Sequence, residues 1–71
     1  MVARYLVNAQ SISDMQFAEL REFLKGITFL VSDIVNKPQT LDVTLNHNQT
    51  IEDLESVFPT LKECHITLIA L

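Results

Sequence analysis

The adjacent pair Cys64-His65 brings a thiol and an imidazole into sequence contact. Such groups could bind a metal ion or form a Cys-His nucleophile. The pair opens a segment with the composition of a β-strand, however, and neighbouring side chains of a strand point to opposite faces of the sheet. We therefore expect a buried Cys64 and a His65 on the sheet surface. His47, in a polar segment, is expected to be solvated.

Three carboxylates, Glu52, Asp53 and Glu55, cluster with no Lys or Arg within four positions. General acid-base catalysis needs two carboxyl groups that face each other across a cleft, commonly with one pKa shifted. Residues this close on one short helix share its outer surface instead. We expect a solvated surface here, and the alternative is an electrostatic contact with a basic protein partner.

Other routes to catalysis or cofactor binding are missing from the sequence. The single glycine cannot build a phosphate-binding loop, and the single cysteine removes zinc-finger and CxxC motifs. Ser11 and Ser13 lack the sequence context of a nucleophile. We expect a protein that is not an enzyme, with no cofactor and no metal site.

The charge pattern bears on the partners. Nine acidic and five scattered basic residues give a net charge of -4. Binding to nucleic-acid phosphates or to anionic lipids requires a basic patch. The chain also has no Trp and a single Tyr to stack on bases. Neither nucleic acid nor membrane is an expected partner.

Length and composition predict one compact domain over residues 1–71. A chain of 71 residues buries only about 60% of its unfolded surface, so its stability should depend on packing or on self-association. Cys64 is the only cysteine, which excludes an internal disulfide and fits a cytoplasmic location. No apolar run approaches the roughly 20 residues that cross a bilayer.

The first helix is predicted near residues 14–25. Ser13 and Gln16 have the spacing of a capping box, and Gly26 is a natural stop. Apolar residues recur at intervals of three and four and form one stripe, which consists of Phe17, Leu20, Phe23, Leu24 and Ile27. A second capping signal at Thr50 and Asp53 predicts a helix over residues 51–58, ended by Pro59.

Four segments have the composition of strands. Residues 2–7 read as a central strand, and residues 28–34 read as a second strand, although a longer first helix would absorb residues 27–35. The segment 40–46 alternates, with Leu41, Val43 and Leu45 on one face, and should form a hairpin with the strand before it. Residues 64–71 form the last strand.

The resulting order, β-α-β-β-α-β, predicts an α+β domain of the ferredoxin-like class, a two-layer sandwich with two helices on one face of a four-stranded antiparallel sheet. The other face should be open and mixed in character. Its expected apolar residues are Val2, Leu6, Leu30, Ile69 and Leu71, and its expected polar residues are Arg4, Asp42, Thr44, His65 and Thr67. We also predict an ion pair between Arg4 and Asp42 on this face.

An open apolar face and an edge strand without Lys or Pro favour a protein-protein interaction module that forms a homodimer. The expected contact residues are Leu68, Ile69 and Leu71 of the last strand. One alternative is a small acidic inhibitor, of the kind encoded by phages or mobile elements, that presents Glu52, Asp53 and Glu55 to a basic site on an enzyme. A module that binds a small regulatory ligand is the remaining alternative.

Overall fold

The computed structural model, which describes residues 2–70, begins both of its α-helices at a capping box. In α1 (Asp14–Ile27) the Ser13 hydroxyl accepts from the Gln16 N–H, and the Gln16 side chain accepts from the Ser13 N–H. In α2 (Ile51–Val57) Thr50 and Asp53 make the same pair of bonds. Both predicted helix starts are therefore confirmed.

The helix ends differ from the predictions. Gly26 lies inside α1, and the predicted stop there is wrong. The helix ends at Thr28, whose backbone N–H and hydroxyl both donate to the Leu24 carbonyl, at 2.9 and 2.6 Å. A side-chain cap therefore takes the place of a left-handed glycine. α2 ends one residue early, and an unpredicted 3-10 helix, η1 (Pro59–Glu63), follows it with proline at its start.

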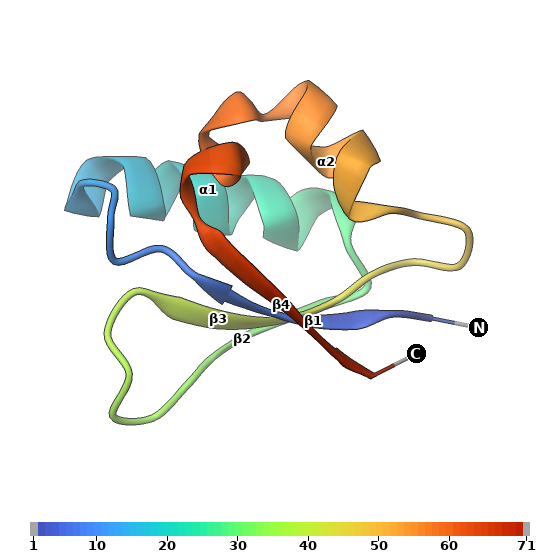
Figure 1. The fold of residues 1–71 in the computed structure, drawn as a ribbon, viewed down its shortest axis with the longest axis horizontal. Helices are drawn as coiled ribbons and strands as arrows, with labels where there is room; N and C mark the ends of the chain where they lie inside the picture. The colour runs from blue at the N-terminus through green and yellow to red at the C-terminus, as the bar shows by residue number, and fades with distance from the viewer. Residues whose placement is uncertain (1, 71) are drawn as a thin grey trace.

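Four strands form one sheet in the order β2-β3-β1-β4, and every neighbouring pair is antiparallel (Figure 1). The strands are β1 (Arg4–Asn8), β2 (Leu30–Asp33), β3 (Thr40–Thr44) and β4 (His65–Ala70). The α+β class, the antiparallel sheet of four strands, the β2-β3 hairpin and the central place of β1 were all expected. Leu71, assigned to the last strand by the sequence pattern, lies outside the described residues.

The predicted strands were too long for local reasons. α1 continues to Ile27, so β2 begins only at Leu30 and the predicted range 28–34 is wrong at both ends. After Thr44 the chain leaves β3, and the side-chain amide of Asn46 donates to the carbonyl oxygen of Ile27, at the end of α1, at 2.8 Å. The turn between β2 and β3 contains two residues with positive φ, Asn36 at 67° and Gln39 at 51°.

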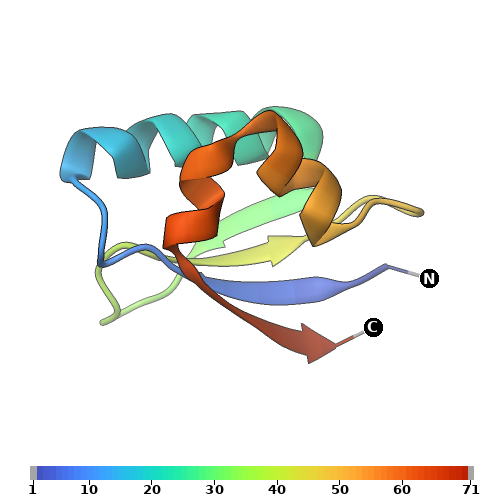
Figure 2. The ribbon, with the colours of Figure 1, turned by 45° about the horizontal axis from the view of Figure 1, so that its top comes forward.

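The two helices cover the same face of the sheet (Figure 2). Between the layers, Leu41, Val43 and Leu45 are completely buried, as the alternating pattern predicted, and pack with Leu20 and Leu24 of α1. The rings of Phe23 and Phe58 stack with their centroids 4.7 Å apart, which joins α1 to the end of α2. The core therefore lies entirely on the helical side of the sheet.

Neither helix, within the part of the chain that the structure describes, has the length and apolar character needed to span a bilayer.

Candidate interaction surface

The strand register places a mixed set of side chains on the face of the sheet that the helices leave uncovered, here called the open face. Leu6 lies opposite Asp42 on one side and Thr67 on the other, and these side chains point away from the helices. The alternation of the strands then assigns the remaining members. The open face includes Arg4, Leu6, Asn8, Leu30, Ser32, Asp42, Thr44, His65 and Thr67.

An ion pair crosses the centre of the open face. The Arg4 guanidinium donates through Nε to Oδ1 of Asp42 at 2.9 Å, and a second bond joins Nη2 to Oδ2. These hydrogen bonds lower the pKa of Asp42 below the usual aspartate value, against the smaller opposing effect of its partial burial. The predicted pairing of Arg4 with Asp42 is confirmed. These two charged side chains of the open face therefore bond to each other.

The strand β4 borders the sheet, and in Figure 2 no other described element lies beyond it. Leu68 is 50% exposed and Ile69 is 46% exposed. The strand contains no Lys, Pro or carboxylate, and its only titratable group is His65. The pairing with β1 shifts by one residue near Ile69, which marks a bulge. We call residues 65–69 of this strand the β4 edge.

Hydrogen bonds at the two ends of β1 reveal which backbone groups of β4 point outward. Ala9 N–H donates to the Gln39 carbonyl and Leu45 N–H donates to the Ala3 carbonyl, each at 2.8 Å. Groups of an antiparallel strand alternate in direction, so residues 3, 5, 7 and 9 face β3 and residues 4, 6 and 8 face β4. Thr67 and His65, the partners of Leu6 and Asn8, therefore bond to β1. The N–H and C=O groups of Ile66 and Leu68 point away from the sheet.

The acidic cluster lies on α2, in the helical layer and therefore away from the open face (Figure 2). Asp53 is used locally, because its carboxylate accepts from the Thr50 N–H at 3.3 Å. Glu52 is exposed and Glu55 is half-buried. The structure thus leaves two of the three carboxylates, Glu52 and Glu55, available for a contact outside the helix.

The Cys64-His65 pair has the expected opposite orientation but not the expected burial. Cys64 is only half-buried, and its thiol lies 3.8 Å from the Thr60 carbonyl. Partial burial, with a smaller effect of Glu63, raises the pKa of this thiol, which disfavours the nucleophilic thiolate. Among residues 2–70, no three His, Cys, Asp or Glu side chains form a group that could hold a metal ion.

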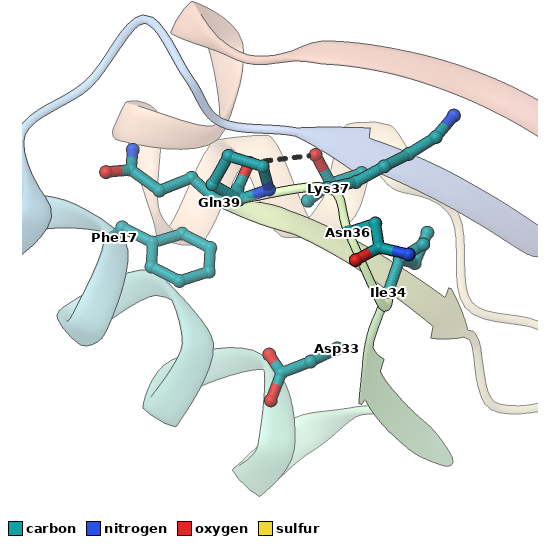
Figure 3. A pocket seen from close by; sticks show the side chains of 8 residues that line it. Phe17, Asp33, Ile34, Asn36, Lys37 and Gln39 are labelled. Carbon is teal, nitrogen blue, oxygen red and sulfur yellow. Dashed lines mark hydrogen bonds between the residues drawn. The ribbon is translucent and has the colours of Figure 1, made fainter.

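An open hollow of about 430 Å³ lies beside the β2-β3 turn (Figure 3). It is lined by Phe17, Asp33, Ile34, Asn36, Lys37, Pro38, Gln39 and Thr40. Some of its polar side chains have local partners: the Thr40 hydroxyl donates to the Pro38 carbonyl at 3.1 Å, and the Asp33 carboxylate accepts from Arg21. These bonds stabilise the turn between β2 and β3.

Gln39 organises this end of the domain in a way that the sequence did not indicate. Its side-chain amide donates to the carbonyl oxygens of Ala9 and Ile12, at 2.7 and 3.0 Å. The residue therefore ties the β2-β3 turn to the loop that precedes α1. No sequence signal marks a glutamine for positive φ, since Gly and Asn are the usual residues there.

Comparisons of the chain with protein-family models, with curated proteins and with solved structures give no match. The surfaces of the domain are then the guide to its function. Within the described residues, the β4 edge combines exposed apolar side chains with outward-facing backbone groups, a combination typical of strand pairing between chains.

Proposed function

We propose that this chain is a non-enzymatic interaction module that forms a homodimer through the β4 edge and the adjoining part of the open face. One observation carries the proposal: β4 presents unpaired backbone groups at Ile66 and Leu68, and its exposed side chains carry no negative charge. Pairing with a second strand would satisfy those groups and cover Leu68 and Ile69.

A second copy is the partner that fits best. Each copy supplies the same edge, and a two-fold axis makes such a surface self-complementary. The added burial would stabilise a domain whose small core contains, among residues 2–70, ten buried apolar residues. The net charge of -4 on each copy opposes association at long range, and salt should therefore strengthen the dimer.

We also propose the ferredoxin-like class for the fold, supported by the strand order β2-β3-β1-β4 and by the two helices on one face. A cytoplasmic location remains a prediction, supported by the single half-buried cysteine.

Contact of the acidic helix α2 with a basic protein is the competing proposal. Its support is the exposure of Glu52 and the partial exposure of Glu55 on one short helix. It is the weaker of the two, because Asp53 already serves as a helix cap. The third expectation, a module for a small regulatory ligand, has less support, since the hollow near Gln39 is open and the side chains of Asp33, Gln39 and Thr40 that line it are already hydrogen-bonded.

Light scattering over a range of concentrations tests the homodimer. The wild-type chain should reach twice the monomer mass at high concentration, and Ile69→Asp should remain a monomer that is less stable, because the dimer would have to remove the new carboxylate from water. The matched control, Glu52→Lys with Glu55→Lys, should still dimerise. A wild-type chain that stays monomeric at millimolar concentration contradicts the proposal.

Salt separates the two candidate functions. Binding of α2 to a basic protein would weaken steeply with ionic strength, because exposed opposite charges act over long range. The homodimer joins copies of the same net charge and should tighten instead. Loss of every captured host protein on reversal of Glu52 and Glu55, together with a monomeric wild type, would favour the acidic contact.

A further inference from the structure

The outward backbone groups of β4 restrict how two copies can pair. When two copies of a strand pair antiparallel about a two-fold axis, the residue numbers of the two residues in each facing pair add up to the same value along the whole strand. The side chains of two facing residues lie on the same side of the joined sheet. Only Ile66 and Leu68 offer outward N–H and C=O groups before the bulge. When Ile66 faces Leu68 of the second copy, the two residues exchange two backbone hydrogen bonds. The symmetric pair, Leu68 with Ile66 of the second copy, adds two more, so four backbone hydrogen bonds form.

Two neighbouring registers fail for identifiable reasons. With Ile66 on the two-fold axis, Leu68 would face Cys64, whose N–H already donates to the Leu61 carbonyl at 3.1 Å. With Leu68 on the axis, Ile66 would face Ala70, which follows the bulge and lies opposite Arg4. The backbone groups of Arg4 face β4, so those of Ala70 turn toward β1 and away from a partner.

We infer that two copies join β4 to β4 in antiparallel orientation with Thr67 on the two-fold axis, which produces one continuous eight-stranded sheet. This inference rests on the proposed homodimer and specifies its register.

The side chains fit this register on both sides of the sheet. On the helical side, the half-buried Ile66 faces the exposed Leu68 of the other copy, and the symmetric pair repeats the contact. On the open side, the two Thr67 side chains face each other at the axis, where cross-strand threonines can share a hydrogen bond. No carboxylate lies on the β4 edge, so like charges do not meet there.

A cysteine at the axis tests the register directly. Thr67 would form a pair without backbone hydrogen bonds, in which the Cα atoms are about 4.5 Å apart, within the range that a disulfide spans. Thr67→Cys in a Cys64→Ser background should therefore form a covalent dimer on mild oxidation. The matched control is His65→Cys in the same background. In the dimer, the two introduced cysteines would be offset by four residues along the strands, which is roughly 13 Å, and the covalent dimer should form at least tenfold less.

Amide hydrogen exchange of the wild-type chain gives a second reading that needs no substitution. The amides of Ile66 and Leu68 should be protected at least tenfold more at high concentration than at low concentration. The Ile34 N–H donates to the Thr40 carbonyl, so by alternation the Val31 amide points away from β3. This amide should exchange equally fast at both concentrations.

The outcomes separate the register from the homodimer itself. A dimer by light scattering, with the amides of Ile66 and Leu68 unprotected or His65→Cys cross-linking more than Thr67→Cys, overturns the register and leaves the dimer standing. A chain that is monomeric at every concentration overturns both. If Thr67→Cys fails to fold, the exchange of the wild-type amides decides the register alone.

Discussion

The two edges of the sheet are built differently. β2 is four residues long, and its last residue, Asp33, carries a carboxylate held by the Arg21 guanidinium of α1 at 2.8 Å. β4 is six residues long, contains neither Lys nor Arg nor a carboxylate, and makes no described ion pair. Short length and charge are the devices that usually prevent an edge from pairing with another chain. The first edge has both of them, and the second has only a bulge.

Exposed apolar surface alone does not distinguish these edges. Phe29, next to β2, is 70% exposed, which exceeds the exposure of Leu68 and Ile69 of β4. The difference lies in the backbone and the charges: β2 points outward through Val31 and Asp33, and any strand paired there would have to accommodate the Arg21-Asp33 ion pair. Because β2 is protected against pairing and β4 is not, the domain can pair through one edge only, which favours a dimer over a chain of copies. We call β2 the closed edge and β4 the open edge.

Closing the open edge should have the largest effect. Leu68→Lys introduces a charge on the helical side of β4, where the dimer would desolvate it, and should raise the dimer Kd by about 100-fold or more. The matched control, Leu30→Lys, places the same charge on β2 and should leave the Kd within about threefold. Sedimentation velocity at several concentrations measures both constants.

Equal weakening by the two lysines would mean that the edges do not differ as described. Weakening by Leu30→Lys alone would assign the interface to β2.

Opening the closed edge is the complementary experiment. Asp33→Val removes the carboxylate and its bond to Arg21, and leaves an apolar β2 beside the exposed Phe29. Species larger than a dimer should then appear at high concentration, in amounts that dilution reverses. The control Asp33→Ser removes the ion pair without adding an apolar side chain, and should remain a dimer. If neither variant assembles further, the short length of β2 is sufficient to block it.

Local signals predicted most of the fold. The capping boxes at Ser13 and Thr50 set both helix starts, because a helix start is fixed by side chains that are close in sequence. The alternation in the segment 40–46 identified the buried face of β3, since only one side of that strand meets the helices. The helix ends were harder to predict: Thr28 caps α1 two residues beyond Gly26, and Pro59, which ends α2 in the sequence pattern, is also the first residue of η1.

The surfaces were predictable only where strand order determined them. The Arg4-Asp42 pair followed from placing the first and third strands side by side, and it is present. The Arg21-Asp33 pair depends on how α1 crosses the sheet, and the Gln39 contacts depend on a positive φ that no residue pattern signalled. The backbone groups of Ile66 and Leu68 point outward because the even-numbered residues of β1 direct their own backbone groups to β4. The sequence does not indicate which residues of a strand bond to which neighbour.

The two ion pairs should contribute unequally to acid stability, which sharpens the contrast between the sheet centre and its β2 edge. Hydrogen bonds from arginine lower the pKa of both Asp42 and Asp33. A lowered pKa in the folded state gives stability that is present above the unfolded value of about 3.9 and lost as pH falls through the lower folded value.

The Asp42 side chain is 22% exposed and that of Asp33 is 61% exposed, so water screens the second pair more. Asp42→Asn should therefore lower the Tm at pH 7 by roughly 2–5 °C and flatten its decline between about pH 4 and 2. Asp33→Asn should change the Tm by no more than about 1 °C. Thermal unfolding at one fixed protein concentration, across this pH range, makes the comparison. A larger loss for Asp33→Asn would show that the edge pair, rather than the central pair, stabilises the sheet.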